Sequence, residues 1–403
     1  GSGPAGLQAA YDLRISGHQV TIFDSQPEPG GMMRWAIPEF RLPVAVVERE
    51  IELLNKIGVD FRCKTTIGKD LSITQLKNEY NAIIIAAGCG NSAKLDIDGQ
   101  NALGVHYGLP FLSAVRNDKA REITGKTVII GGGDVAVDAA QTALRLGAES
   151  VTIVSLENED ELPATPEAVE SAIKEGIKFE YSWGPARILT QNGSVSGVQL
   201  QRCMAVFDGQ NRFNPVFDRC ELNDILAETV IICIGQSRDN TCLNDLEKSK
   251  NFNKNQINTD PLTLQTTEET IFVAGDFYSG PSSIVSSMAS GREAAESVNR
   301  LLEGEHLKYG RNYRGPFEME FDIDTTPGSD KNRATLQLRD YKGKGDFNEI
   351  EKGLSQEAAR NEASRCYSCG EPFGKFQTCW FCLPCEVECP NEALRVEIPY
   401  LLR

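Results

Sequence analysis

The first 24 residues, GSGPAGLQAAYDLRISGHQVTIFD, decide the fold of the amino-terminal half. Gly1, Gly3 and Gly6 form a G-x-G-x-x-G pattern, whose glycines allow a tight turn, close approach of a pyrophosphate and close packing of helix on strand. The helix that follows offers free N–H groups and a positive dipole end. Apolar spacing predicts this helix up to Gly17 and a strand at 20–23. We therefore predict a Rossmann-like dinucleotide-binding unit that has lost the strand expected before Gly1.

An acid stands where such a unit needs one. Asp24 ends the predicted strand, and an acid at this place accepts hydrogen bonds from an adenosine ribose. A lone G-x-G-x-x-G is a weak pattern, so a plain glycine turn is the alternative. The correctly spaced acid favours nucleotide binding.

A second glycine pattern begins at Gly131. Gly133 and Ala136 complete it, with alanine at the third position as the motif permits. Strands are expected at 127–130, 150–154 and 229–234, and a helix at 135–146. The sequence thus predicts an α/β protein with two Rossmann-like units.

A distant stretch, IFVAGDFYSGPSSIVSSMASGREAAESV, places Gly275 and Asp276 at a strand end before a helix with small residues. With it, the chain resembles flavoproteins that have two dinucleotide-binding domains, and above all the glutamate synthase small (beta) subunit group and its ferredoxin–NAD(P) relatives. The matching stretches keep the family's order: GSGPAG, GGMMRWAIPEFRLP, Ala86-Ala87-Gly88, GGGDVAVDAA, Ile234-Gly235-Gln236, and AGDFYSGP with GREAA.

The resemblance implies two three-layer, glutathione reductase-like domains, with the nicotinamide domain inserted into a discontinuous FAD domain. The expected bounds are 1–118 and 239–310 for FAD, 119–238 for NAD(P), 311–355 for a connecting segment, and 356–403 for a small ferredoxin-like 4Fe–4S module.

The resemblance also implies which residues contact the cofactors. Asp276 would hold the ribityl chain, Asp24 the adenosine ribose, and the Gly30-Gly31 loop would lie along the flavin; a simple helix-start cap is the alternative for Asp276. The full expected set is Gly1, Gly3, Pro4, Ala5, Gly6, Asp24, Gly30, Gly31, Arg41, Gly88, Gly131, Gly133, Asp134, Val135, Ala136, Glu157, Gly235, Gln236, Gly275, Asp276, Ser283 and Ile284.

Glu157 predicts the preferred nucleotide. Relatives that use NADPH carry an arginine pair just past the strand after the second glycine pattern, whereas this chain reads Ser155-Leu156-Glu157. A carboxylate there accepts from a free 2′-hydroxyl and repels a 2′-phosphate, so we expect NADH over NADPH. The alternative is that Glu157 is a solvated loop residue and a later arginine recognises the phosphate.

No catalytic side chain is predicted. Hydride transfer belongs to the two cofactors, and the protein supplies stacking and orientation. The three histidines, His18, His106 and His306, are expected to be structural.

Six of the 12 cysteines crowd near the carboxyl end. Cys379, Cys382, Cys385 and Cys389-Pro390 form the C-x2-C-x2-C-x3-C-P run of bacterial ferredoxins, and Cys366 and Cys369 add a C-x2-C pair. These six thiolates can hold one [4Fe–4S] cluster with two to spare, or contribute to two clusters. Relatives place them closer together, which leaves the ligand assignment open, and a structural zinc site is the alternative.

Composition limits the partners. A net charge of −16 argues against nucleic acid, because binding to a phosphate backbone needs clustered Lys and Arg. No apolar stretch is long enough to span a membrane, so no membrane insertion is expected. Closely spaced cysteines without a readable secretory signal indicate a reducing cytoplasm.

Together these features predict an electron-transfer oxidoreductase subunit. Hydride would pass from NAD(P)H to FAD, and single electrons to [4Fe–4S] and then to a partner redox subunit or ferredoxin, in either direction. Two alternatives stay open: a dithiol-relay reductase of the thioredoxin reductase type, which needs a C-x-x-C beside the flavin, and a non-catalytic scaffold subunit.

Overall fold

The computed structural model describes residues 1–117, 122–245, 257–309, 311 and 332–365. The chain divides into two units: Gly1–Lys308 with Tyr341–Glu349, and Tyr309–Asp340 with Ile350–Arg403. All six predicted cluster ligands, from Cys366 to Cys389, lie outside the described residues. No helix in the described ranges is long and apolar enough to cross a membrane.

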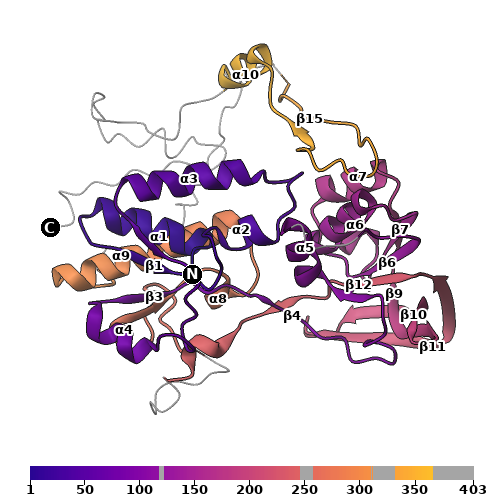
Figure 1. Cartoon of the computed structure of the whole chain (residues 1–403), viewed down its shortest axis with the longest axis horizontal. Coiled ribbons are helices and arrows are strands. Elements are labelled where there is room, and N and C mark those ends of the chain that lie inside the picture. The colour runs from indigo at the N-terminus through magenta and orange to yellow at the C-terminus, as the bar shows by residue number, and fades with distance from the viewer. Residues whose placement is uncertain (118–121, 246–256, 310, 312–331, 366–403) are drawn as a thin grey trace, which may run out of the picture. The chain divides into compact units, whose positions relative to one another are not determined.

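The first unit contains a region built from both ends of its chain, which we call the first region (Figure 1). Its elements are α1 (Pro4–Ile15), β1 (Thr21–Phe23), α2 (Gly31–Trp35), α3 (Val44–Lys56), β2 (Asp60–Arg62), α4 (Ile73–Glu79), β3 (Ile83–Ile85), β4 (Asn91–Ser92), β13 (Gln236–Ser237), β14 (Ile271–Val273), α8 (Asp276–Ser279) and α9 (Ile284–Glu303).

Pairing joins the two distant halves of this region. β14 runs parallel to β3, and β13 pairs antiparallel with β4. α9 packs on α1 so closely that a methyl group at Gly291 would collide with the Ala5 backbone. The small residues of the late helix therefore serve this close helix packing, and strands from both parts of the chain pair in this region.

The second region lies between these halves in the sequence and has three layers (Figure 1). Its parallel five-stranded sheet has the order β5-β12-β6-β7-β8, and a three-stranded antiparallel sheet has the order β11-β10-β9. The elements are β5 (Val105–Tyr107), α5 (Gly108–Arg116), β6 (Lys126–Ile130), α6 (Asp134–Leu146), β7 (Ser150–Val154), α7 (Pro166–Lys174), β8 (Lys178–Glu180), β9 (Trp183–Gln191), β10 (Ser194–Phe207), β11 (Phe213–Leu226) and β12 (Thr229–Ile232).

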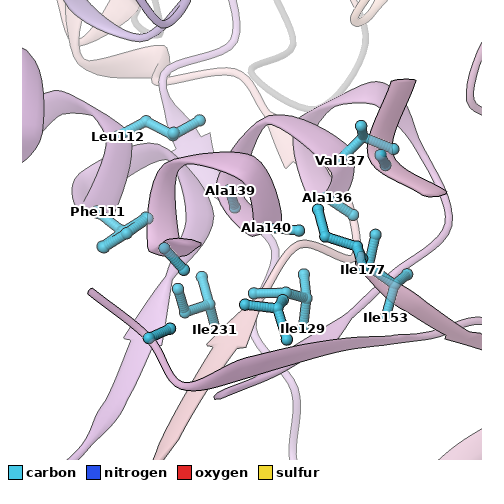
Figure 2. Packing of buried hydrophobic residues seen from close by; sticks show 14 of the residues in the cluster. Phe111, Leu112, Ile129, Ala136, Val137, Ala139, Ala140, Ile153, Ile177 and Ile231 are labelled. Carbon is cyan, nitrogen blue, oxygen red and sulfur yellow. The ribbon is translucent and has the colours of Figure 1, made fainter. Parts of the chain in front are cut away.

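Alternating side chains bury both faces of the parallel sheet. Ile129, Ile153 and Ile231 point toward the alanines of α6, as Figure 2 shows. Val128 and Val230 belong instead to a cluster shared with β9 and β10. Burial on both faces explains why these strands read as continuous apolar runs.

In the sequence, the three-stranded sheet is marked only by alternating apolar and polar residues around 195–200. The exposed side chains of β11 explain this, because an edge strand without a buried face carries no apolar periodicity.

The described part of the predicted connecting segment contains no helix up to residue 355. It holds the short pair β15 (Gln337–Leu338) and β16 (Glu351–Lys352), and α10 (Gln356–Ala363) follows. A part of it, Tyr341–Glu349, groups with the first unit, where the Gly345 N–H donates to the Arg145 carbonyl at 2.8 Å. Sequence reasoning did not anticipate this return; the predicted domain bounds themselves stay predictions.

Candidate functional site

The first glycine pattern forms a cradle at the start of α1. A methyl group at Gly6 would collide with the Gly1 carbonyl oxygen, and one at Gly1 with the Ala86 carbonyl oxygen. A methyl group at Gly3 would meet nothing within 4 Å. The turn is therefore packed from behind and open in front, where the first N–H groups of the helix lack helical partners.

Ser2 ties the predicted acid to this turn. The buried carboxylate of Asp24 accepts from the Ser2 N–H at 2.7 Å, from the Ser2 hydroxyl, and from the Gln26 N–H at 2.8 Å. The Ser2 Oγ in turn accepts from the Gly30 N–H at 3.1 Å. Gly31, at φ +52°, lies against Gly3, where a methyl group would come within 2.6 Å of the Gly3 Cα. Three predicted parts of the site are thus brought together.

The segment 275–287, which we call the late segment, lies against the same turn. A methyl group at Gly275 would lie 2.7 Å from the Ala5 Cβ, so this glycine sets the approach. The Asp276 carboxylate accepts from the hydroxyls of Ser282 at 2.7 Å and Ser287 at 2.9 Å. Asp276 is the first residue of α8, and Gly275 occupies the N-cap position before it. Ser283, by contrast, caps α9 by accepting from the Ser286 N–H at 3.0 Å.

The end of β3 contributes two neighbouring residues. Gly88, at φ +70°, faces open space, because a methyl group at this position would meet nothing within 4 Å. The Cys89 thiol donates to the Asp276 carbonyl oxygen at 3.1 Å. This hydrogen bond joins the strand end to the late segment.

The second glycine pattern forms a similar cradle at the start of α6. A methyl group at Gly131 would collide with the Cys233 carbonyl oxygen, whereas one at Gly133 would meet nothing within 4 Å. A methyl group at Gly132 would lie 3.0 Å from a carboxylate oxygen of Glu157. The acid that was predicted to select the nucleotide therefore lies beside the second cradle.

Asp134 begins the helix of this cradle, whereas the predicted Gly235 and Gln236 contact residues 92–93. The Asp134 carboxylate accepts from the Thr165 N–H at 3.0 Å and hydroxyl at 3.1 Å, which joins the starts of α6 and α7. The carbonyl oxygen of Gly235, at φ +126°, accepts from the Ala93 N–H at 2.9 Å, and Gln236 pairs with Ser92.

Arg41 lies among residues of the second region. Its Nε forms an ion pair with Asp138, and its Nη2 donates to the Gln141 Oε1 at 3.0 Å. Burial raises the pKa of Asp138 to about 6, and the Arg41 charge opposes the rise. The Nε and Nη2 atoms of Arg41 are therefore directed at α6, and the predicted cofactor contact of Arg41 stays a prediction.

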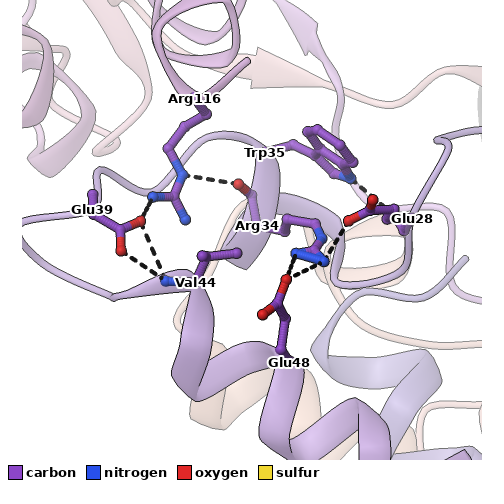
Figure 3. A network of polar contacts seen from close by, with 7 residues as sticks. All are labelled: Glu28, Arg34, Trp35, Glu39, Val44, Glu48 and Arg116. Carbon is purple, nitrogen blue, oxygen red and sulfur yellow. Dashed lines mark hydrogen bonds and ion pairs between the residues drawn. The ribbon is translucent and has the colours of Figure 1, made fainter. Parts of the chain in front are cut away.

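Sequence reasoning missed the residues that join the two regions. Arg116 of α5 is paired with Glu39, and its Nε donates to the Arg34 carbonyl at 2.9 Å, as Figure 3 shows. Arg145 is fully buried, pairs with Glu175 at 2.6 Å, and stacks on the Phe40 ring at 4.1 Å. The spacing of Asp138, Gln141 and Arg145 on one helix face was the available signal.

The described cysteines give no support to dithiol chemistry. Cys63, Cys89, Cys203, Cys220, Cys233 and Cys242 are all free. Burial raises the pKa of Cys89 and of Cys233, and that of Cys242 to about 11, which disfavours their thiolates. In the described part of the chain, no three His, Cys, Asp or Glu residues gather as a metal site.

One predicted structural histidine has a clear partner. His18 lies in the turn after α1, and its Nε2 hydrogen-bonds with the Asn299 Oδ1 of α9 at 2.8 Å. The contact links the turn after α1 to α9 and involves no residue of the first glycine pattern.

Comparison with known proteins agrees with this geometry. The family model described as pyridine nucleotide-disulphide oxidoreductase matches residues 1–291, which contain both cradles and the late segment. The chain belongs to this family. Its fold is shared with Mycobacterium tuberculosis FprA in complex with NADPH (TM-score 0.63, 16% identity, 75% of this chain and 83% of that one) and with Lactococcus lactis thioredoxin reductase (TM-score 0.57, 23% identity, 75% and 97%).

Curated relatives are similar over longer stretches. The chain is 32% identical to the beta subunit of the NADP(+)-dependent formate dehydrogenase of Moorella thermoacetica, over 92% of this chain and 54% of that protein. It is 30% identical to the beta subunit of a Geobacter sulfurreducens NADPH-Fe(3+) oxidoreductase (92% and 60%) and 34% identical to Salmonella typhimurium PreT, an NAD-dependent dihydropyrimidine dehydrogenase subunit (75% and 67%). The chain spans little more than half the length of the first two.

The two cradles fit the cofactors that this family implies, FAD and a nicotinamide dinucleotide. Each has an open glycine at a helix start, where Gly3 and Gly133 leave room for a pyrophosphate, and each has an acid beside it. A side chain at either glycine would fill the space that the pyrophosphate needs.

Proposed function

We propose that this chain is an electron-input subunit that receives hydride from NAD(P)H, with NADH favoured, on FAD and delivers single electrons to an iron–sulfur module. From there the electrons would pass to a partner redox subunit or a ferredoxin, in either direction. The observation that carries the proposal is the presence of two glycine cradles, each with an adjacent acid, in one compact unit. The relatives named as enzyme subunits support a partner protein.

The first cradle would hold FAD. The N–H groups at the start of α1 would bind the pyrophosphate beyond Gly3, Asp24 would accept from the adenosine ribose, and Asp276 from the ribityl chain. The serine hydroxyls of Ser282 and Ser287 keep the Asp276 carboxylate in one place. When bound, FAD would supply the step between a two-electron hydride donor and one-electron carriers.

The second cradle would hold the nicotinamide dinucleotide, and Glu157 would choose between its two forms. The names of relatives include both NADP-dependent and NAD-dependent proteins, so the family alone leaves the choice open. The carboxylate of Glu157 lies beside Gly132, within reach of an adenosine ribose at the cradle. This position favours a bond to a free 2′-hydroxyl over the alternative of a solvated loop residue.

The iron–sulfur part of the proposal rests on the cysteine run. Cys379, Cys382, Cys385 and Cys389 have ferredoxin spacing, and Cys366 and Cys369 can complete one cluster or help to hold a second. A [4Fe–4S] cluster would supply one-electron transfer. Iron and acid-labile sulfide in stoichiometric amounts after anaerobic purification are expected, whereas stoichiometric zinc without sulfide would favour the structural alternative.

The dithiol-relay alternative is weaker because it needs a C-x-x-C pair beside the flavin, and the six cysteines that precede Cys366 stand singly in the sequence. The scaffold alternative predicts flavin that NADH does not reduce. The experiment that separates the proposal from the scaffold alternative is anaerobic addition of NADH to the purified protein, followed through the flavin absorbance band. Bleaching supports the proposal, and an unchanged band would overturn it.

Nucleotide preference is tested by steady-state kinetics with both donors and an artificial electron acceptor. We expect kcat/KM to be higher for NADH. A preference for NADPH of roughly tenfold, equivalent to about 1.4 kcal/mol, would refute the role of Glu157.

A further inference from the structure

The segment 35–43, WAIPEFRLP, which we call the junction segment, connects α2 to α3 in the first region and also makes polar contacts with the second. Three of its side chains meet helices α5 and α6. Arg41 pairs with Asp138 and Gln141, Glu39 pairs with Arg116, and Phe40 lies under the guanidinium of Arg145. None of these residues belongs to either glycine pattern.

The second-region side chains that the junction segment contacts are largely buried, whereas its own Arg41 and Glu39 side chains are 28% and 38% exposed. The side chains of Arg116 and Arg145 are 7% and 1% exposed, and that of Asp138 is 12% exposed. Exposed ion pairs contribute little, but a buried charge that loses its partner is strongly destabilising. If the second region turned away from the first, Asp138 would lose the ion pair with Arg41.

Two of the partners on the second region, Gln141 and Arg145, are themselves held by further hydrogen bonds. Gln141 donates to the Ser171 hydroxyl of α7 at 3.1 Å, and Arg145 is bound by Glu175 and by the Asp346 carbonyl at 2.8 Å. On the other side, both oxygens of Glu39 accept from the Val44 N–H that begins α3. In Figure 3 the Arg116 side chain reaches between Glu39 and the Arg34 carbonyl. Residues of both regions therefore hold the side chains of the junction contacts in place.

We propose that Arg41 and Asp138 are positioning residues that fix the orientation of the second cradle relative to the first. The pair acts with the Phe40–Arg145 stack and the Glu39–Arg116 pair as a clamp between the two regions. Regions joined by a modest interface move relative to each other by default, so specific contacts are needed to hold them in one orientation. Its consequence for catalysis rests on the proposed function: hydride transfer needs reacting atoms about 3–3.5 Å apart, and a misplacement of about 1 Å can cost about 100-fold.

The clamp itself is tested by a distance measurement that needs no activity. Spin labels at positions 56 on α3 and 174 on α7, introduced through ketone-bearing amino acids so that the cysteines stay untouched, report on the two regions. Both lysines there are exposed. We expect one narrow distance distribution in the otherwise unchanged protein, a broader or displaced one in Arg41→Ala and Asp138→Asn, and an intermediate one in Arg41→Lys, which keeps the charge but loses the planar fork.

Arg49→Ala is the matched control, because Arg49 also lies on the first region but its side chain is 69% exposed. This variant should keep the narrow distribution. A broad distribution in the unchanged protein, or a narrow and unshifted one in both Arg41→Ala and Asp138→Asn, would overturn the clamp.

The catalytic consequence is measured by rapid mixing with NADH. In Arg41→Ala and Asp138→Asn we expect flavin content and NADH dissociation constant to stay within about twofold, while the rate constant of flavin reduction falls at least about tenfold. A lower flavin content with an unchanged rate per bound flavin would instead make Arg41 a cofactor contact and overturn its positioning role. If NADH fails to reduce the unchanged protein while its distances stay narrow, the proposed function fails and the clamp stands.

Discussion

The two cradles share one glycine geometry, but the regions around them are built in different ways. The first is assembled from distant parts of the chain: β14 pairs with β3, and α9 packs on α1. The second is contiguous, with a five-stranded parallel sheet and helices from 105–232. The first cradle therefore depends on long-range contacts that a single substitution can break. The second follows β6, which lies between two other strands of the same contiguous sheet.

The largest effect is expected where the two halves of the first region meet. Gly291→Ala places a methyl group against the Ala5 backbone and must force α9 from α1. We expect the free energy of unfolding to fall by about 3 kcal/mol, with loss of bound flavin. Urea unfolding and the flavin spectrum of the purified protein measure both.

Gly209→Ala is the control for this substitution, because a methyl group at Gly209 in the second region meets nothing within 4 Å. It should leave stability and flavin content unchanged. A Gly291→Ala protein as stable as the control and fully loaded with flavin would show that the helix contact is dispensable.

The regions also differ in how they bury charge, and this difference predicts a pH dependence. Burial raises the pKa of Asp138 to about 6, above its ordinary value of 3.8, so the folded protein holds this proton more tightly than the unfolded chain. The stability from this group is full below about pH 4 and is lost as the pH rises through about 6. The free energy of unfolding of the unchanged protein minus that of Asp138→Asn should therefore fall by on the order of 2 kcal/mol between pH 4 and 7.

Urea unfolding of both proteins across this pH range measures the difference. It should become flat above about pH 7, where Asp138 is ionised in both states. A difference that rises with pH would mean that the Arg41 charge outweighs burial and lowers the pKa.

The same contrast separates what the sequence could predict from what it could not. Strand 150–154 and helix 135–146 were predicted within a residue, because β-branched runs and helical spacing stand between clear turns. Asp24 and Gly275 lie beside the first glycine turn, since their spacing follows a rigid backbone geometry; their roles toward a cofactor stay predictions. Local patterns carried these predictions.

The junction between the regions could not be predicted in this way. Arg145 is fully buried, although arginine is ordinarily a surface residue, and its partners Phe40, Glu175 and Asp346 are far apart in the sequence. Local spacing shows which face a residue occupies, but it does not show which distant side chain will cover that face. One local signal was readable and unused: Ser72 and Gln75 form a capping box at the start of α4.

A matched pair of substitutions tests whether the cradles bind different cofactors. Gly3→Ala and Gly133→Ala each place a methyl group in open space at a helix start, so both proteins should fold normally. Gly3→Ala is expected to weaken flavin binding by roughly tenfold to thirtyfold, about 1.4–2 kcal/mol, while Gly133→Ala weakens NADH binding by a similar factor and keeps the flavin. Flavin content after dialysis and NADH titration measure the two. Each substitution serves as the control for the other, and loss of flavin in Gly133→Ala would reverse the assignment.

The smallest expected effect concerns the acids beside the two cradles. Asp24 is buried and held by Ser2 and Gln26, whereas Glu157 is half-buried beside Gly132. Glu157→Gln keeps the size of the side chain but removes the charge that would repel a 2′-phosphate. We expect the ratio of kcat/KM for NADH to that for NADPH to fall by roughly fivefold, about 1 kcal/mol, without loss of flavin.

Glu159→Gln is the matched control, because Glu159 is exposed in the same loop two residues further on. A change in the ratio that is equal in both variants would mean that the general charge of this loop, and not a bond from Glu157 to the ribose, sets the preference. A ratio that changes in Glu157→Gln alone, and mainly through the KM for NADPH, would assign the selection to repulsion at one position. The second cradle would then select its nucleotide through the half-buried Glu157, whereas Asp24 of the first cradle is buried and also hydrogen-bonded to Ser2 of the turn.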